Sequence, residues 1–476
     1  MMDILILKLM VIFMRSQLRN HIQLELMLAS KITIMKLFKN CLYIVIAGLS
    51  LTSCDDFLDI KPADKIIPET YEDFRKLQTG AYEVGLIDRS RSTIFTDEAI
   101  LDEWGAEAEE FQDYYLWKSV LSSKARSLPY QEFYKVIFYE NEIISQAANM
   151  KEGSQEEINQ LVAEAYFMRA YMHFNVLNLY AKPYNKETAS TDKGVPVVTL
   201  IDIEQPFPVS TIEEVYTQIL SDVDSTMKYI NVAEYEKGLN YRVSKVAALG
   251  IKARMHLYRG EYLLAKDAAL EAYTINNQLV DLNEDNAIMP YHFKSKENVF
   301  AAEQTFDNIL SFNLLASNEL ISKYNAQDLR LSKYYSSGWS GNTTNKGKNS
   351  ENKCSFRTSE LYLILAECEA NLNENLPKAK EYLNTLKQNR LEAEFYALEE
   401  IRINAMTQAE LITEVAKERC RELAFEGHRW YDLRRTTQQS LTHTFGGETE
   451  VLEEGDPRYT LRFPQEAVDN NPNLNN

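Results

Sequence analysis

The chain has 476 residues, of which 45% are hydrophobic and 25% charged, and its formal net charge is −19 at pH 7. This acidic balance argues against nucleic acid as a partner, because nucleic-acid binding needs a basic surface. The length permits more than one hydrophobic core.

Residues 35–53 have the order of a secretory signal peptide. Lys36 and Lys39 precede the apolar stretch 42–49, and small residues then lead to Cys54. The apolar stretch is too short to cross a bilayer as a helix. The four residues that end at Cys54 resemble a bacterial lipobox, which predicts cleavage before Cys54, acylation of its thiol and attachment to a membrane by lipid.

The signal peptide makes the preceding residues unusual. Signal peptides normally occupy about 15–30 residues from the initiator methionine. We therefore expect Met35 to be the true start and residues 1–34 to be a mis-called extension. The alternative is a genuine N-terminal hydrophobic segment built on residues 4–14. Residues 54–476 are then expected to form a single domain, which contains no apolar run of the roughly 20 residues needed to cross a bilayer.

Helical signals dominate this domain. Ser154 and Thr407 are each followed three residues later by Glu, which predicts capping boxes at the start of two helices. A third helix is expected to be capped by Thr211 or Ser210. The prolines that stand at expected first helical positions are Pro129 and Pro377.

Two stretches are typical of paired helices. Residues 247–273 and 361–390 alternate small and large apolar residues in the pattern of a tetratricopeptide repeat, with Gly260 and Pro377 at the turns. Each hairpin leaves an apolar face that must stack on another. The sequence therefore predicts a mainly α fold of tetratricopeptide-like hairpins in an α–α superhelix, with long irregular loops and a few short strands. Ordinary hairpins without a repeat ancestry are the alternative.

The connecting segments contain many aromatic residues. Residues 92–127 and 325–353 are long and irregular, and loops of this length are usually functional or disordered. The stretches 195–201 and 298–304 have strand character and are expected to form small hairpins at most. Cysteines 354, 368 and 420 lack metal-ligand spacing, so we expect three unpaired, buried thiols and neither metal nor cofactor.

Residues 418–435 contain acids, bases, a histidine and two aromatic residues, so an active site has to be considered. His428 could act as a general base oriented by Glu426 or Asp432. No nucleophile elbow, metal-ligand pair or phosphate loop accompanies it. The pattern favours a packed helix end with local ion pairs, such as that of Arg419 with Glu422. We therefore predict no catalytic residue here.

In that interpretation the run has a structural role. Gly427 is expected to end the helix with a positive φ. Trp430 and Leu433 are expected to face the core.

Several segments together resemble a known family. They are 53–59, 163–171, 357–368 and 421–435, with 463–466 and 471–473 near the end of the chain. In order and position these segments are similar to the SusD/RagB family of Bacteroidetes lipoproteins. The resemblance implies an α-helical body with tetratricopeptide-like units and an irregular face built from long loops.

The resemblance also implies a location and a role. The protein would be lipid-anchored on the outer membrane, exposed at the cell surface, beside a SusC-like TonB-dependent barrel. It would act there as a lid, without catalysis, that captures a nutrient, usually a glycan, and passes it to the barrel.

The aromatic residues in the loops are then candidates for sugar contacts, because sugar C–H groups pack on aromatic faces. The expected platform consists of Trp104, Trp117, Tyr334, Tyr335 and Trp339. The expected hydroxyl partners are Asn342, Asn345 and Asp97.

Three alternatives remain open. Aromatic loops would serve a peptide equally well, as in the RagB branch of the family. A periplasmic tetratricopeptide-type scaffold that binds proteins would share the helical architecture. An enzyme is the third alternative.

Overall fold

The structure is a computed structural model that describes residues 68–84, 89–201 and 206–475. The predicted extension, signal peptide and acylation site at Cys54 lie outside the described residues. Pro68–Asn476 forms one compact unit.

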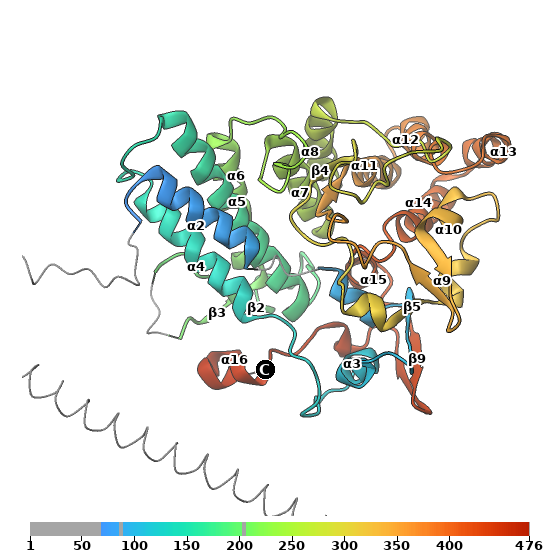
Figure 1. Cartoon of the computed structure of the whole chain (residues 1–476), viewed down its shortest axis with the longest axis horizontal. Helices are drawn as coiled ribbons and strands as arrows, with labels where there is room; N and C mark the ends of the chain where they lie inside the picture. The colour runs from blue at the N-terminus through green and yellow to red at the C-terminus, as the bar shows by residue number, and fades with distance from the viewer. Residues whose placement is uncertain (1–67, 85–88, 202–205, 476) are drawn as a thin grey trace, which may run out of the picture. The chain divides into compact units, whose positions relative to one another are not determined.

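Helices make up most of this unit (Figure 1). The α-helices are α2 (Tyr71–Glu83), α3 (Ala108–Tyr115), α4 (Gln131–Gln146), α5 (Gln155–Tyr180), α6 (Ile212–Tyr229), α7 (Lys245–Tyr258), α8 (Tyr262–Ile275), α9 (Asn318–Ser322), α10 (Leu329–Tyr334), α11 (Thr358–Leu372), α12 (Leu376–Gln388), α13 (Ala393–Asn404), α14 (Gln408–Glu422), α15 (Arg429–Arg435) and α16 (Gln465–Asn470). The 3-10 helices are η2 (Arg89–Phe95), η3 (Leu310–Phe312), η4 (Pro457–Tyr459) and η5 (Pro472–Leu474).

The strands are short and form four small sheets. They are β1 (Ala99–Leu101), β2 (Lys193–Pro196), β3 (Val209–Thr211), β4 (Asn298–Phe300), β5 (Leu314–Ala316), β6 (Tyr335–Ser337), β7 (Asn342–Thr344), β8 (Phe356–Arg357), β9 (Leu441–Phe445) and β10 (Glu448–Leu452). The largest sheet has the order β1-β5-β7-β6, and every pairing in it is antiparallel. The predicted mainly α fold with few short strands is confirmed.

The long helices pack as successive antiparallel pairs. Both predicted hairpins are present, as α7 with α8 and α11 with α12, and α5 pairs with α6 in the same way. Contacts from α6 to α7 and from α8 to α11 join these pairs into one array, with α2 and α4 beside α5 (Figure 1). Gly260 turns the chain between α7 and α8 with a φ of +70°, a conformation that glycine adopts without strain.

Helix α5 is buried around most of its circumference because α2, α4 and α6 all pack against it. From Gln160 onward nearly every residue of α5 is buried, as expected for a helix with neighbours on all sides. Capping boxes start α5 at Ser154, α6 at Thr211 and α14 at Thr407. These three caps were predicted, because their signal is local.

Some boundaries differ from the predicted ones. Pro129 precedes the N-cap Tyr130 of α4 and is not its first helical residue, whereas Pro377 lies in the first turn of α12. Helix α14 ends at Glu422, before the predicted end at Gly427. Phe425 and Gly427, both with positive φ, then redirect the chain into α15.

The segments predicted as irregular loops contain regular elements. Residues 92–127 include β1 and α3, and residues 325–353 include α10, β6 and β7. Of the predicted strand stretches, 298–304 forms β4, which pairs with the distant β8 rather than within a hairpin. Stretch 195–201 contributes only its first residues, to β2. Three-residue strands have too little sequence pattern to reveal distant partners.

No helix in the described part of the chain is long and apolar enough to span a membrane.

Candidate functional site

Two tryptophan side chains project into solvent from the sheet β1-β5-β7-β6. Trp104 is 78% exposed and Trp339 is 88% exposed. Their ring centroids lie 6.2 Å apart, with the ring planes inclined at 60°. Large exposed aromatic side chains are uncommon on soluble proteins, so this tryptophan pair is the candidate site.

The sheet brings the two rings together from different parts of the chain. Trp104 follows β1, where its backbone N–H donates to the Asp102 carboxylate over 3.1 Å. Trp339 lies in the β6–β7 turn, which the N–H of Gly338 closes by donating to the carbonyl of Gly341 over 2.7 Å. The register places these two segments at opposite ends of the short sheet, so the rings reach each other by folding back toward the sheet between them.

The sheet presents an apolar outer face. Ile100 and Leu315 are paired across β1 and β5, and both alternate with buried neighbours. Such alternation places them together on the outer side of the sheet. A side chain on Gly341 would meet Leu315 at 3.3 Å, so the turn that carries Trp339 packs close to this face.

Three predicted platform residues are buried and lie outside the exposed tryptophan pair. The indole N–H of Trp117 donates to the Phe95 carbonyl over 3.2 Å, and its ring stacks on His443 at 4.1 Å. Tyr334 is buried against Lys346, and the hydroxyl of the buried Tyr335 is hydrogen-bonded to Tyr324. We therefore exclude Trp117, Tyr334 and Tyr335 from the platform.

The predicted hydroxyl partners also separate into two groups. Asp97 is buried, and Arg429 donates to both of its carboxylate oxygens over 2.7 Å. Burial raises the pKa of Asp97, but Arg429 and Lys323 outweigh this effect and hold the pKa below its usual value. Asp97 is therefore committed to a structural ion pair and is unsuited to reading sugar hydroxyls.

The two asparagines flank β7, Asn342 as its first residue and Asn345 directly after its end. Asn342 accepts a hydrogen bond from Ser337 over 2.9 Å and is half-buried at the start of β7. Asn345 accepts from Ser336 over 2.7 Å and donates to the Lys333 carbonyl over 3.1 Å. Asn342 is the predicted polar residue that remains closest in the chain to the tryptophan pair.

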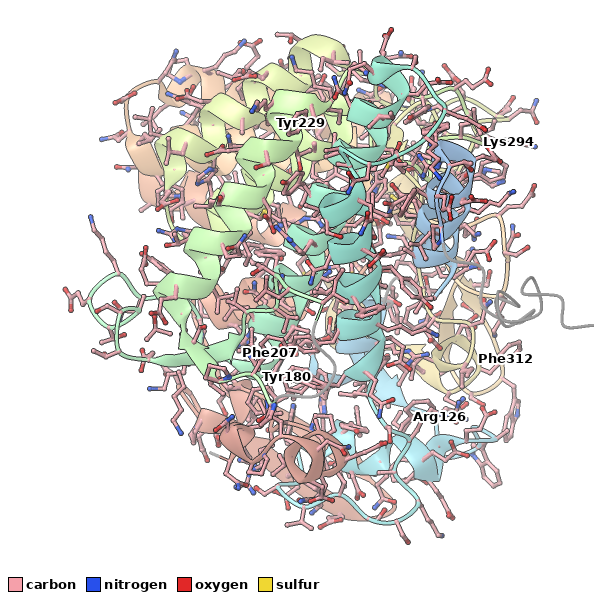
Figure 2. The ribbon with its side chains drawn as sticks, turned by 90° about the vertical axis from the view of Figure 1, so that its left-hand side faces the viewer. Arg126, Tyr180, Phe207, Tyr229, Lys294 and Phe312 are labelled. Carbon is pink, nitrogen blue, oxygen red and sulfur yellow. The ribbon has the colours of Figure 1, made fainter. Side chains whose placement is uncertain are left out.

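One exposed ring was missed by the sequence analysis. Phe312 is 61% exposed and is visible at the edge of the view in Figure 2. The Lys348 ammonium lies 4.7 Å from the centroid of its ring. Phe312 immediately precedes Asn313, whose side chain holds the segment after Trp104 through Glu107. The alternation of apolar and polar residues around 310–316 was the available signal.

The run 418–435 forms the centre of a buried ion-pair network. Glu422 accepts hydrogen bonds from the guanidinium groups of Arg330, Arg357 and Arg390. Burial raises the pKa of Glu422, but these three cations hold it well below the usual value. Arg419, predicted to pair with Glu422, instead donates to Asp432 over 3.1 Å. The predicted burial of Trp430 and Leu433 is confirmed.

His428 is not placed as a general base. It is buried, and burial together with four nearby arginines lowers its pKa well below the usual value. The predicted orienting carboxylates bind other partners: Glu426 pairs with Lys346 and Arg357, and Asp432 with arginines. The histidine therefore has neither a base-orienting partner from this run nor access to solvent.

The three predicted free cysteines, Cys354, Cys368 and Cys420, are free and buried. Burial raises the pKa of the Cys420 thiol to about 12, which opposes reactivity. Within the described residues, no cluster of three or more His, Cys, Asp or Glu side chains is suited to hold a metal ion.

Comparisons with known proteins agree with this architecture. The model of the SusD family matches residues 271–476, and a model described as "Starch-binding associating with outer membrane" matches residues 56–257. SusD-like protein P38 of Formosa agariphila is 26% identical over 258 residues, which cover 51% of this chain and 47% of that relative. The chain thus spans about half the length of this relative.

Solved structures share the fold. A SusD superfamily protein of Bacteroides thetaiotaomicron has a TM-score of 0.68 and 21% identity, over 85% of this chain and 98% of its own. A SusD-like carbohydrate binding protein of Bacteroides vulgatus has a TM-score of 0.66 and 18% identity, over 85% and 97%. The two family models together match most of the chain, residues 56–257 and 271–476, and the chain belongs to the SusD/RagB family.

Proposed function

We propose that this protein binds an oligosaccharide on the exposed pair Trp104 and Trp339 and carries out no catalysis. The pair is the observation that carries the proposal. Two neighbouring indole rings in water gain free energy when an apolar surface covers them. The C–H face of a sugar ring is such a surface, and its partly positive hydrogens favour the negative face of an aromatic ring.

The surroundings of the pair suit a hydroxyl-rich ligand. Ile100 and Leu315 extend the apolar surface, while the side chains of Ser336, Ser337 and Asn342 offer polar groups on the neighbouring strands. Binding sites of this kind combine apolar contact with a few polar groups that fix the orientation of the ligand.

The family supports a wider role. One family model is described as starch-binding and associated with the outer membrane, and one solved relative is described as carbohydrate-binding. We infer that the chain is lipid-anchored through Cys54 at the outer-membrane surface. There it would close as a lid over a SusC-like TonB-dependent barrel and deliver the oligosaccharide to it. Residues 1–34 would be an extension and 35–53 a signal peptide.

A glycan array probed with the purified full chain tests the proposal. The full chain should bind at least one class of oligosaccharide, and Trp104→Ala and Trp339→Ala should each weaken that binding about tenfold. Leu398→Ala is the matched control, because Leu398 is an exposed apolar residue on α13, away from the sheet. Binding to peptides alone, or unchanged glycan binding in both tryptophan variants, would contradict the proposal.

A further inference from the structure

A second feature lies apart from the tryptophan pair. A cleft of about 1840 Å³ opens between the end of α5, the segment after α3 and the C-terminal part of the chain. Its lining comes mainly from the segments 113–121, 180–193 and 455–465, though not from every residue in them, and neither Trp104 nor Trp339 belongs to it. Figure 2 labels Tyr180, the last residue of α5, near the lower end of the helices.

The residues that line the cleft are mostly basic, whereas the chain as a whole is acidic. The charged side chains that line the cleft are Lys118, Lys182, Lys186, Lys193, Arg434, Arg435, Arg458 and Arg462, with the acids Asp113, Asp192 and Asp456. The whole chain has a formal net charge of −19. A cleft lined mostly by one sign of charge concentrates ligands of the opposite sign.

Half of these cations are already neutralised by carboxylates of the chain. Lys182 pairs with Asp192 at 2.8 Å, and Arg458 pairs with Asp456 at 2.7 Å. Lys118 pairs with Glu448 and Glu450 of β10, and Arg435 pairs with Glu367 and Asp432.

The other four have no such partner. Among the described residues, no carboxylate lies in ion-pair range of Arg434, Lys186, Lys193 or Arg462. The Lys193 ammonium donates a hydrogen bond to the Asn475 carbonyl over 3.3 Å. Asp113 is the lining acid without a cationic partner; it accepts from the Ser122 N–H over 2.6 Å. The charged groups of the cleft that lack an ion-pair partner therefore carry a net positive charge.

Arg434 is the least expected of these cations. Its side chain is only 2% exposed, and its two terminal nitrogens donate to the carbonyl oxygens of Asn178 and Ala181. Its Nε–H has no hydrogen-bond acceptor. Burial without a carboxylate lowers the pKa of Arg434 to about 10, so the guanidinium remains charged at neutral pH. A buried charge normally has an anionic partner.

Tyr180 supplies a second unpaired donor in the same lining. Its side chain is 3% exposed, and its hydroxyl has no hydrogen-bond partner. The ring is fixed by stacking on Phe463, with centroids 5.2 Å apart. Burial raises the pKa of this tyrosine well above its usual value, so the hydroxyl keeps its proton. An unsatisfied buried donor is costly, and a ligand that accepts from it recovers that cost.

We propose that this cleft is a second ligand site, specific for an acidic oligosaccharide whose carboxylate or sulfate oxygens accept hydrogen bonds from Arg434 and Tyr180. Lys186, Lys193 and Arg462 attract the ligand from the rim. The anion site follows from the cleft alone; the saccharide nature of its ligand rests on the proposed function.

The remaining lining suits a saccharide. Neutral polar side chains that can meet hydroxyl groups line the cleft at Ser119, Asn185, Thr191, Thr436 and Gln465. Sites for drug-sized ligands have volumes of about 300–1,000 Å³. The larger volume of this cleft leaves room for several sugar residues.

Binding measurements on the full chain test the proposal with four probes. They are an oligogalacturonate, a sulfated galactan oligosaccharide, a neutral malto-oligosaccharide and a poly-glutamate peptide. At least one acidic saccharide should bind, more weakly as salt rises. The two acidic saccharides show whether carboxylate or sulfate is the preferred anion.

Two variants locate the binding. Tyr180→Phe removes only a hydroxyl that has no partner, so the fold is preserved, and affinity for the acidic saccharide should fall about fivefold. The triple variant Lys186→Gln, Lys193→Gln, Arg462→Gln changes exposed side chains, and affinity should fall about tenfold or more. The matched control is Lys76→Gln, Lys135→Gln, Lys417→Gln, which makes the same charge change on exposed residues outside the cleft.

Three results would overturn the proposal: no acidic saccharide binds, both cleft variants bind with unchanged affinity, or only poly-glutamate binds. The double variant Trp104→Ala, Trp339→Ala separates this proposal from the proposed function. It should retain the Tyr180-dependent binding of the acidic saccharide. If the Tyr180-dependent binding is present but no saccharide loses affinity in the double variant, the cleft proposal is supported and the proposed tryptophan site is wrong.

Discussion

At the scale of single residues, exposure distinguishes side chains that look alike in the sequence. Trp104 and Trp117 lie in the same aromatic segment after η2. Trp104 points into solvent, whereas Trp117 is buried by stacking on His443 of β9. The ring that can meet a ligand is therefore determined by a contact far along the chain, which local pattern does not contain.

Glu98 is a buried acid directly before β1, and it gives the fold a pH dependence. One of its oxygens accepts from the Phe425 N–H over 3.2 Å, and burial beside Asp97 raises the pKa of Glu98 to about 8. Its folded-state pKa lies above its unfolded value. The stability that the protonated form contributes is thus complete below about pH 4.3 and is lost as the pH rises through 8.

Glu98→Gln should therefore stabilise the protein at alkaline pH. The neutral amide keeps the acceptor for Phe425 and removes a buried carboxylate, so the gain should grow from pH 5 to pH 9 and reach on the order of 3 kcal/mol. Thermal unfolding across this range measures it. Glu454→Gln, at an exposed position, should show no such trend. A difference between Glu98→Gln and the parent chain that does not change with pH would contradict this account.

Glu422 lies where three guanidinium groups converge. Glu422→Gln should destabilise the fold by about 3–5 kcal/mol, because it leaves Arg330, Arg357 and Arg390 with too little buried negative charge. Chemical denaturation measures the free energy of unfolding, with Glu454→Gln again as the exposed control. A loss below about 1 kcal/mol would show that the three arginines are neutralised without Glu422.

At the scale of elements, the helices were predictable and the sheet was not. The hairpins α7–α8 and α11–α12 follow from a local apolar period, and the capping boxes are local as well. The sheet β1-β5-β7-β6 joins three-residue strands that are distant in the chain. The partners of Glu422 were missed for the same reason, since its arginines come from α10, β8 and the turn after α12.

Glycines at two turns allow a matched test of element packing. Both Gly260 and Gly427 have positive φ. A Cβ on Gly260 would meet nothing within 4 Å, whereas on Gly427 it would meet the main chain of Arg89 at 2.3 Å. Gly260→Ala should therefore cost about 1 kcal/mol from backbone strain alone.

Gly427→Ala should cost several times more than Gly260→Ala, because the backbone of η2 must also move. Denaturant titration of both variants provides the comparison. Equal losses of stability would contradict the close packing of η2 against the turn that leads into α15.

At the scale of the whole molecule, the helical array holds two surfaces of different chemistry. The sheet presents an apolar pair of indole rings, and the cleft below α5 presents uncommitted positive charge. The family and the mainly α fold could be predicted from sequence motifs; the exposed surfaces required the three-dimensional contacts.

The central claim is that a saccharide covers Trp104 and Trp339, and fluorescence quenching tests it directly. The chain has four tryptophans, of which Trp117 and Trp430 are buried. Acrylamide should quench the exposed pair in the free protein, and a saturating oligosaccharide selected on the array should remove most of that quenching. The result that would contradict the claim is strong oligosaccharide binding that leaves the quenching of both exposed tryptophans unchanged.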